Sequence, residues 1–172
     1  MKVEELALQR KRYAHLSDEE WRWMLQQVEG HQRTHDKLPT FAQIDDWWYP
    51  VRLSCEQCSS EATARYKAEI IRQLGEKQNI LIDLTGGYGV DTYFLSEQTA
   101  QAHYVERNEE LCRIVAHNFC KIRPQVQIHN TNSIHYLQDM PACDVVYIDP
   151  ARRDQHGGKV FRLEDCEPNV ID

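Results

Sequence analysis

The sequence has no apolar run close to the ~20 residues that a membrane-spanning helix needs. It also lacks an excess of basic residues, because 27 Asp and Glu outnumber 20 Lys and Arg and give a formal net charge of −7. The first absence argues against a transmembrane protein. The second argues against a chain whose whole surface attracts nucleic acid. No internal repeat or low-complexity segment is present, and 41% hydrophobic residues is ordinary for a globular domain.

The six cysteines form no recognisable disulfide or zinc pattern. Cys55-x-x-Cys58 has no second Cys-x-x-Cys, so a zinc site would have to combine it with His31-x-x-x-His35 from an unlike segment. We predict no metal, with that zinc site as the less favoured alternative. The first residues mix acids and bases on an amphipathic pattern, unlike a secretory leader. We therefore expect a cytoplasmic protein with reduced thiols.

The first 50 residues predict a small helical region. Ser17 and Glu20 have the spacing of a capping box, in which each residue satisfies a backbone N–H of the other. The segment Asp45–Pro50, DDWWYP, is interpreted as a hydrophobic clasp, or alternatively as a surface that stacks on a base. The expected helices are Glu4–His15, a second from Ser17 to about Gly30, and a short one after Thr40.

Helical and strand patterns alternate from residue 51 onward. The segment around Cys55 and Cys58 is interpreted as a loop, and the next helix should bury Tyr66, Ile70 and Leu74 as its apolar stripe. Such alternation predicts an α/β domain with a parallel sheet and right-handed crossovers. The expected strands are Ile80–Leu84, Ala102–Val105, Val126–His129 and Asp144–Ile148. The expected helices are Glu61–Leu74, capped by a preceding serine, and Val90–Ser96, Glu109–Ile122 and Ser133–Gln138.

Acidic and glycine residues stand at the ends of the first two predicted strands. In ILIDLTGGYGVD, Asp83 ends the first strand, and Gly86, Gly87 and Gly89 follow it. Glycines allow a ligand to approach the backbone closely in a loop that joins a strand to a helix. Glu106 ends the second strand, at the distance where an acid accepts hydrogen bonds from both hydroxyls of a ribose.

Polar residues also follow the third and fourth strands. Asn130 and Asn132 could contact an adenine edge, and Asp149-Pro150 would lie beside the reactive end of the ligand. The dinucleotide fingerprint needs a third glycine where this sequence has Thr92, and no P-loop sequence is present. An acid before the glycines, with no basic residue close by, disfavours a phosphate. The pattern therefore favours cationic S-adenosylmethionine over NAD.

The segments DLTGGYGVD, YVERN and YIDPARR resemble motifs I, II and IV of the class I S-adenosylmethionine-dependent methyltransferases. With EQCSSEATARYKAEI, they are most similar to a bacterial group of methyltransferases with a THUMP-like domain. A more distant similarity is to RNA guanine-N2 methyltransferases of the trimethylguanosine synthase type. The resemblance covers roughly Leu53 to Asp172. It implies a Rossmann-like sheet, S-adenosylmethionine as cofactor, and RNA as substrate, methylated on a base amino group.

The resemblance also implies a role for particular residues. The catalytic pair would be Asp149 and the Pro150 carbonyl, which face the methyl acceptor, and Arg152 and Arg153 would bind the substrate. In amino-methylating relatives a proline and an aromatic ring follow the Asp-Pro pair, where this sequence has alanine and Arg152. An arginine can stack on a base or bind a phosphate. The implied cofactor-binding residues are Asp83, Thr85, Gly86, Gly87, Gly89, Asp91, Glu106, Arg107, Asn132 and Ser133.

We expect two parts, a helical region at 1–50 and the N-terminal part of a methyltransferase domain at 51–172. The resembled fold has more strands than the four predicted here, so we expect a truncated sheet with an exposed last strand. That edge could be covered in a homodimer. A non-catalytic protein-interaction module on a degenerate or truncated sheet is the alternative function.

Overall fold

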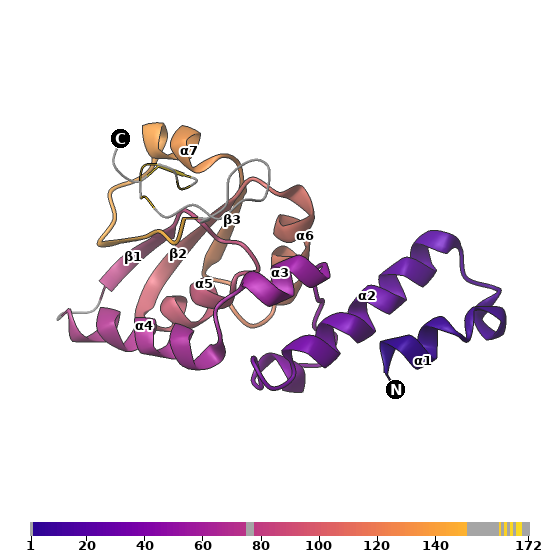
Figure 1. The fold of residues 1–172 in the computed structure, drawn as a ribbon. Coiled ribbons are helices and arrows are strands. Elements are labelled where there is room, and N and C mark those ends of the chain that lie inside the picture. The colour runs from indigo at the N-terminus through magenta and orange to yellow at the C-terminus, as the bar shows by residue number, and fades with distance from the viewer. Residues whose placement is uncertain are drawn as a thin grey trace.

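Four parallel strands form the centre of the structure, a computed structural model that describes residues 2–74 and 78–150, and also residues 162, 164, 166, 168 and 169. The strands are β1 (Gln78–Asp83), β2 (Thr99–Glu106), β3 (Val126–Asn130) and β4 (Val145–Tyr147), in the order β3-β2-β1-β4 (Figure 1). Each neighbouring pair is parallel. The predicted parallel α/β sheet is confirmed, and the ends of its strands differ from the prediction by a few residues.

Helices cover the two faces of the sheet unequally (Figure 1). They are α4 (Glu61–Gln73), α5 (Val90–Leu95), α6 (Glu109–Phe119) and α7 (Ser133–Asp139), with a 3-10 turn, η3 (Ser96–Gln98), after α5. Because side chains alternate along a strand, Leu81 and Tyr104 pack on the face of α4, α5 and α6, whereas Ile82 and Val105 pack on the face of α7. The first of these faces holds the larger core.

The helical N-terminal region consists of α1 (Val3–Ala7), η1 (Arg10–Tyr13), α2 (Asp18–Thr34), η2 (Phe41–Gln43) and α3 (Arg52–Gln57). The predicted capping box is confirmed: Ser17 Oγ accepts a hydrogen bond from the Glu20 N–H, and the Glu20 carboxylate accepts one from the Ser17 N–H. The helix continues past its predicted end at Gly30. A Cβ at this position would lie 2.2 Å from Tyr49 Cβ, so the glycine serves close packing and does not end the helix.

The single helix predicted over Glu4–His15 is wrong. It is divided into α1 and η1, and Leu8 between them is 89% exposed. The Arg10 guanidinium donates hydrogen bonds to the carbonyl oxygens of Tyr13 and Leu16, at 2.7 and 2.9 Å. These bonds stabilise tight turns at the place where a regular helix would have continued.

The apolar stripe predicted for α4 is also wrong. Tyr66, Ile70 and Leu74 are 67%, 44% and 64% exposed, whereas Ala64 and Ala68 are buried. The helix lies against α5, where small side chains let two helices approach closely. The start of α4 agrees with the prediction, since a serine hydroxyl caps it. Large apolar residues therefore remain on the outer side of α4.

Aromatic residues that precede β1 in the sequence pack into the larger core of the sheet. Phe41 is fully buried, and its ring centroid lies 4.2 Å from that of Trp47 and 4.9 Å from that of Tyr93. Trp47 Nε1 donates a hydrogen bond to Tyr88 Oη at 2.7 Å. The interpretation of DDWWYP as a hydrophobic clasp between the helical region and the sheet is confirmed by these contacts.

We predict that Phe41→Ala lowers the free energy of unfolding by about 3–5 kcal/mol, because it leaves a cavity where helical region and sheet meet. Leu8→Ala is the matched control, and removing its exposed side chain should change stability by less than about 0.5 kcal/mol. Urea unfolding followed by circular dichroism measures both values. Equal stabilities of the two variants would show that Phe41 does not contribute to the core of the sheet.

Candidate functional site

The loop between β1 and α5 contains three glycines that are required for different reasons. A Cβ at Gly86 would lie 2.2 Å from the ring of Tyr104, and Gly89 combines a φ of +78° with close side chains of α6. Packing inside the protein explains both. Gly87 has a φ of +52°, and among the described residues beyond its chain neighbours a Cβ there would meet only the Thr85 carbonyl oxygen, at 3.8 Å. Gly87 is therefore the glycine whose backbone a ligand can approach.

Asp83 supports this loop from within the protein. Its side chain is fully buried, Oδ1 accepts a hydrogen bond from the Thr85 N–H, and Oδ2 accepts one from Thr92 Oγ1. Burial raises the pKa of Asp83 to about 7, although both hydrogen bonds act in the opposite direction. The threonine that replaces the third glycine of the dinucleotide fingerprint thus holds the loop through Asp83.

Glu106 lies beside the open part of the loop. Its Oε2 accepts a hydrogen bond from the Gly87 N–H at 3.0 Å, and its Oε1 accepts one from the Asn108 N–H at 2.7 Å. An oxygen of an ionised carboxylate can accept two hydrogen bonds, so the contacts found within the described part of the chain leave one acceptor position on each oxygen. The carboxylate is fixed in place and can still accept from two hydroxyls.

The predicted residues after β3 lie at the same edge of the sheet. Asn130 pairs with Glu106 in the strand register, and its Nδ2 donates to the carbonyl oxygens of Glu106 and Arg107 at 3.0 and 3.1 Å. Asn132 caps α7 through its side-chain oxygen, and Ser133 is the first residue of that helix. These contacts join the ends of β2 and β3 and fix the start of α7.

The end of β4 is tied to the glycine loop. The Asp149 N–H donates a hydrogen bond to Thr85 Oγ1 at 2.7 Å, and the Asp149 side chain is 56% exposed. Pro150 is half-buried. The residues predicted as the catalytic pair therefore lie at the same edge as the loop. Arg152 and Arg153, predicted to bind the substrate, lie outside the described residues.

Ser59, Lys67 and Tyr147, which the sequence did not predict as site residues, complete this edge. Lys67 Nζ donates hydrogen bonds to Ser59 Oγ at 3.0 Å, to Asp91 Oδ2 at 3.0 Å and to Tyr147 Oη at 2.6 Å. It also lies 3.6 Å from Asp149 Oδ2. We refer to Ser59, Lys67, Asp91, Tyr147 and Asp149 as the Lys67 cluster. The spacing of Ser59 and Lys67 matches no known motif. The only indication in the sequence was the resemblance of EQCSSEATARYKAEI to the methyltransferase group named above.

Two properties of the cluster bear on ligand binding. Asp91 Oδ1 is buried and has no hydrogen-bond partner among the described residues, while Asp91 Oδ2 accepts hydrogen bonds from three donors. Burial raises the pKa of Tyr147, and the nearby carboxylates of Asp91 and Asp149 raise it further. The phenol stays protonated and acts as a hydrogen-bond donor.

The zinc site considered as an alternative has no support in the described part of the chain. No group of three His, Cys, Asp or Glu there could hold a metal ion. The loop predicted around the two upstream cysteines is wrong, because Cys55 lies in α3 and Cys58 follows its last residue. Burial raises the pKa of Cys55 to about 12, so its thiol is protonated, and Sγ donates to the Pro50 carbonyl.

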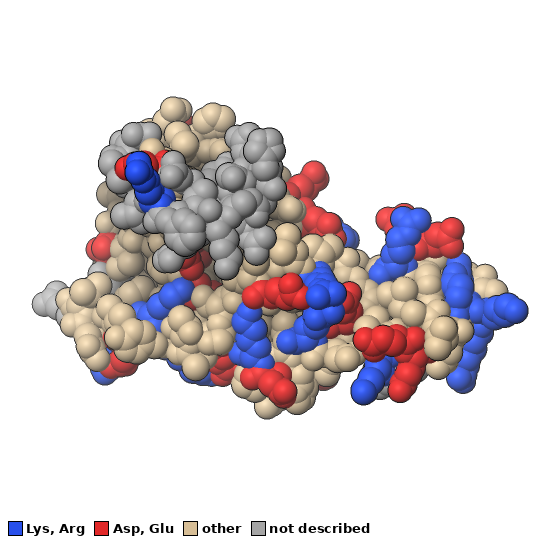
Figure 2. Space-filling view, viewed as in Figure 1, with Lys and Arg blue, Asp and Glu red and all other residues tan. Residues whose placement is uncertain are grey.

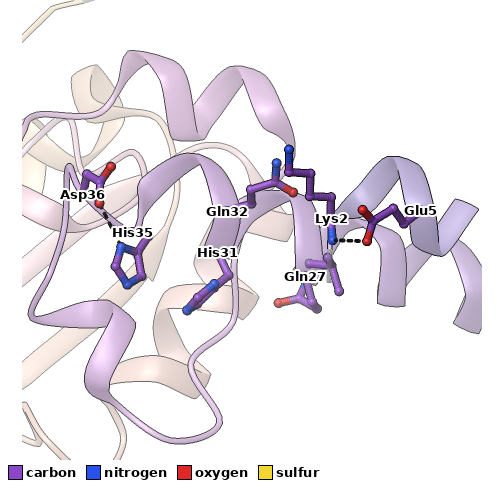
Figure 3. Close-up of a pocket in the computed structure, with 8 residues that line it drawn as sticks. Lys2, Glu5, Gln27, His31, Gln32, His35 and Asp36 are labelled. Carbon is purple, nitrogen blue, oxygen red and sulfur yellow. Dashed lines mark hydrogen bonds and ion pairs between the residues drawn. The ribbon is translucent and has the colours of Figure 1, made fainter.

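Other polar features lie away from the loop edge. A groove beside α1 and α2 is lined by residues that include Lys2, Glu5, His31 and His35 (Figure 3). His31 and His35 belong to the zinc site considered as an alternative, but none of the lining residues was predicted to bind the methyl donor or its acceptor. Within residues 2–74 and 78–150, no helix combines the length and apolar character that crossing a bilayer requires.

The histidines of the sheet, His103 and His129, and His117 of α6 make packing contacts. His103 Nδ1 lies 3.1 Å from His129 Nε2 and 2.6 Å from Tyr136 Oη, on the α7 face. Burial lowers the pKa of both imidazoles, which favours their neutral forms. His117 stacks on Trp48 with 3.7 Å between ring centroids, so one face of this indole is already covered.

No protein-family model matches the sequence, and no curated protein matches it. Among solved structures, a protein from Porphyromonas gingivalis W83 assigned as a methyltransferase is 31% identical to this chain, with a TM-score of 0.75. The match covers 90% of this chain and 38% of that protein. A protein from Pyrococcus horikoshii assigned as an RNA methyltransferase is 16% identical, with a TM-score of 0.51. That match covers 66% of this chain and 58% of the other protein. This chain has the Rossmann-like fold of these structures. It spans less than two thirds of the length of either protein.

We predict that Asp83→Asn changes how stability depends on pH. The pKa of Asp83 is about 7 in the folded protein and 3.8 ordinarily, so the folded state binds the proton more tightly. Its contribution to stability is greatest below pH 4 and declines as the pH rises to 7, by roughly 4 kcal/mol for the full shift. Asparagine cannot ionise, so the wild type should lose stability relative to the variant between pH 5 and pH 7.5. If the free energies of unfolding of the wild type and of Asp83→Asn change equally with pH, the raised pKa of Asp83 is contradicted.

We also predict that two neighbouring glycine variants lose very different amounts of stability. Gly86→Ala should unfold the domain or strongly destabilise it, because the new Cβ overlaps the buried Tyr104 ring. Gly87→Ala has space for its methyl group and should cost only about 1–2 kcal/mol for the left-handed backbone. Thermal unfolding of both proteins distinguishes them. Equal destabilisation would show that backbone conformation alone explains the two glycines.

Proposed function

We propose that this chain is the donor-binding part of an S-adenosylmethionine-dependent methyltransferase that acts on an amino group of an RNA base. The proposal treats residues 51–172 as part of the methyltransferase domain and residues 1–50 as a separate helical region. The observation that carries it is the position of Glu106, held by the Gly87 N–H and still able to accept hydrogen bonds. The similarity to the Porphyromonas gingivalis protein supports it independently.

The residues of the site fit S-adenosylmethionine in three ways. The donor has a ribose, for which Glu106 offers acceptor positions, and its amino-acid portion can approach the open Gly87. The donor also carries a sulfonium and an ammonium and has no phosphate. The carboxylates of Asp91 and Asp149 suit such a cation, whereas they would repel the pyrophosphate of NAD.

The chemistry supplied by the bound donor is an already activated methyl group, so the protein has mainly to position an acceptor. The Asp149 carboxylate and the Pro150 carbonyl can both accept hydrogen bonds from an exocyclic amino group. The hydrogen bond from the Asp149 N–H to Thr85 fixes this acceptor site relative to the glycine loop. We propose Asn132 and Ser133 as contacts of the adenine and Arg152 and Arg153 as contacts of the RNA.

The RNA substrate rests on the resemblance of DPARR to motif IV. Along α2 and α3, Figure 2 shows Lys and Arg side chains next to Asp and Glu side chains. Several are ion pairs, since Arg33 contacts Glu29 and Glu56, and Arg52 also contacts Glu56. This mixed surface is not a basic platform for a phosphate backbone. We place RNA binding on the side of Asp149.

A second candidate, a protein-interaction module, is favoured by exposed apolar side chains. Tyr66, Ile70 and Leu74 form a stripe on the outer face of α4, and Val146 of β4 is 45% exposed. In the described sheet β4 has a strand partner on one side only. A homodimer through this edge is compatible with either function. Analytical ultracentrifugation of the wild type and of Val146→Lys distinguishes a dimer from a monomer.

We predict that the 172-residue chain binds S-adenosylhomocysteine and that Glu106→Ala weakens binding about 10-fold to 100-fold, because hydrogen bonds to a charged group are lost. Isothermal titration calorimetry measures this, with NAD as the ligand that should not bind. Glu110→Ala, an exposed acid on α6, is the control and should leave the affinity unchanged. Transfer of tritiated methyl groups into separated RNA and protein fractions then identifies the acceptor class. A wild type that binds neither S-adenosylmethionine nor S-adenosylhomocysteine excludes the proposed function.

A further inference from the structure

We infer that Lys67 is a specificity-determining residue, whose charge sets the preference of the site for the positively charged methyl donor over the neutral demethylated product. The inference rests on the proposed function and concerns Lys67, which lies outside motifs I, II and IV. It starts from the charges in the Lys67 cluster. That cluster combines one ammonium with the carboxylates of Asp91 and Asp149, and its formal charge is therefore −1.

The contacts of Lys67 show that it is fixed within the site. Its three ammonium hydrogens match three hydrogen bonds, to Ser59, Asp91 and Tyr147. The side chain is 24% exposed, and that of Asp91 is 13% exposed. A partly buried charge with all donors used is poorly suited to bind a further ligand group directly. Its effect on a ligand is instead electrostatic and acts across a short distance in a partly desolvated environment.

Lys67 acts where the reacting ends of donor and acceptor would meet. It reaches from α4 to Asp91 in the first turn of α5 and to the end of β4, where Tyr147 and Asp149 lie. The Asp149 N–H in turn contacts Thr85 of the glycine loop. The lysine is thus the positive charge found closest to both carboxylates at this edge among the described contacts.

The donor and its product differ by one charge. Loss of the methyl group converts the sulfonium into a neutral thioether, while the ammonium, carboxylate, ribose and adenine stay the same. An excess negative charge at the site therefore favours the donor and disfavours retention of the product. Lys67 limits that excess to one charge, which prevents the donor from being bound too tightly and keeps Asp91 paired.

Lys67→Met tests this inference by calorimetry with both ligands. The affinity for S-adenosylmethionine relative to S-adenosylhomocysteine should rise about threefold to tenfold, because the cluster becomes more negative by one charge. Rising salt from about 20 mM to about 500 mM should reduce this effect, since screening weakens interactions between separated charges. Lys67→Arg, which keeps the charge, should retain a ratio close to that of the wild type. Lys121→Met removes an exposed positive charge elsewhere and is the control for net charge.

Asp149→Asn provides a second test that does not depend on the buried part of the cluster. Its side chain is more than half exposed, and its backbone bond to Thr85 is kept. The ratio should fall by about threefold to tenfold, opposite to the change in Lys67→Met. If the wild type binds both ligands and neither variant changes the ratio beyond twofold, the inference is wrong and the proposed function stands. If the wild type binds neither ligand, both are wrong.

Discussion

The contact between Tyr104 and the glycine loop determines where the candidate site lies. Tyr104 is fully buried in β2, its ring occupies the space where a side chain at Gly86 would lie, and its Oη donates a hydrogen bond to the Gly87 carbonyl at 2.6 Å. The loop is thereby fixed to β2 as well as to β1. Glu106, two residues after Tyr104, is then placed beside the Gly87 N–H. Packing in the core and geometry at the ligand edge are thus parts of one arrangement.

Charge is distributed unevenly around this arrangement. Asp83 is fully buried, and burial raises its pKa to about 7, so near neutral pH its carboxyl group is only partly ionised. Asp91 and Asp149 are balanced in part by Lys67. Among the described contacts, the two carboxylates of the Lys67 cluster exceed its one ammonium, so this part of the edge carries a moderate negative charge. Such a charge is what the proposed cationic methyl donor requires and what a dinucleotide would disfavour.

Much of the fold was predictable, because period-two and helical patterns alternate at regular spacing and Ser17 and Glu20 mark a helix start directly. Two of the failures, the end of α2 and the apolar stripe of α4, have a common cause in close packing that a single sequence does not reveal. Gly30 looks like a helix end until Tyr49 is found against it, and the helix α4 turns its alanines inward. At the site, the positions of Asp83, Glu106 and Asp149 at the ends of predicted strands indicated that they lie at one edge of the sheet. Lys67 was missed because three separate segments, Ser59–Lys67, Asp91 and Tyr147–Asp149, have to come together before its role is visible.

The most direct test of the account is a titration of the isotopically labelled chain with S-adenosylhomocysteine, followed by backbone amide NMR. If the loop edge binds the donor, saturable shifts will appear at Gly87 and Asn108, whose N–H groups contact Glu106, and at the residues around Thr85. Gly30, remote from the loop edge in α2, should not change. Shifts confined to the groove at α1 and α2, or no saturable shifts at the loop, would contradict the central claim that the carboxyl edge of this sheet holds a methyl donor.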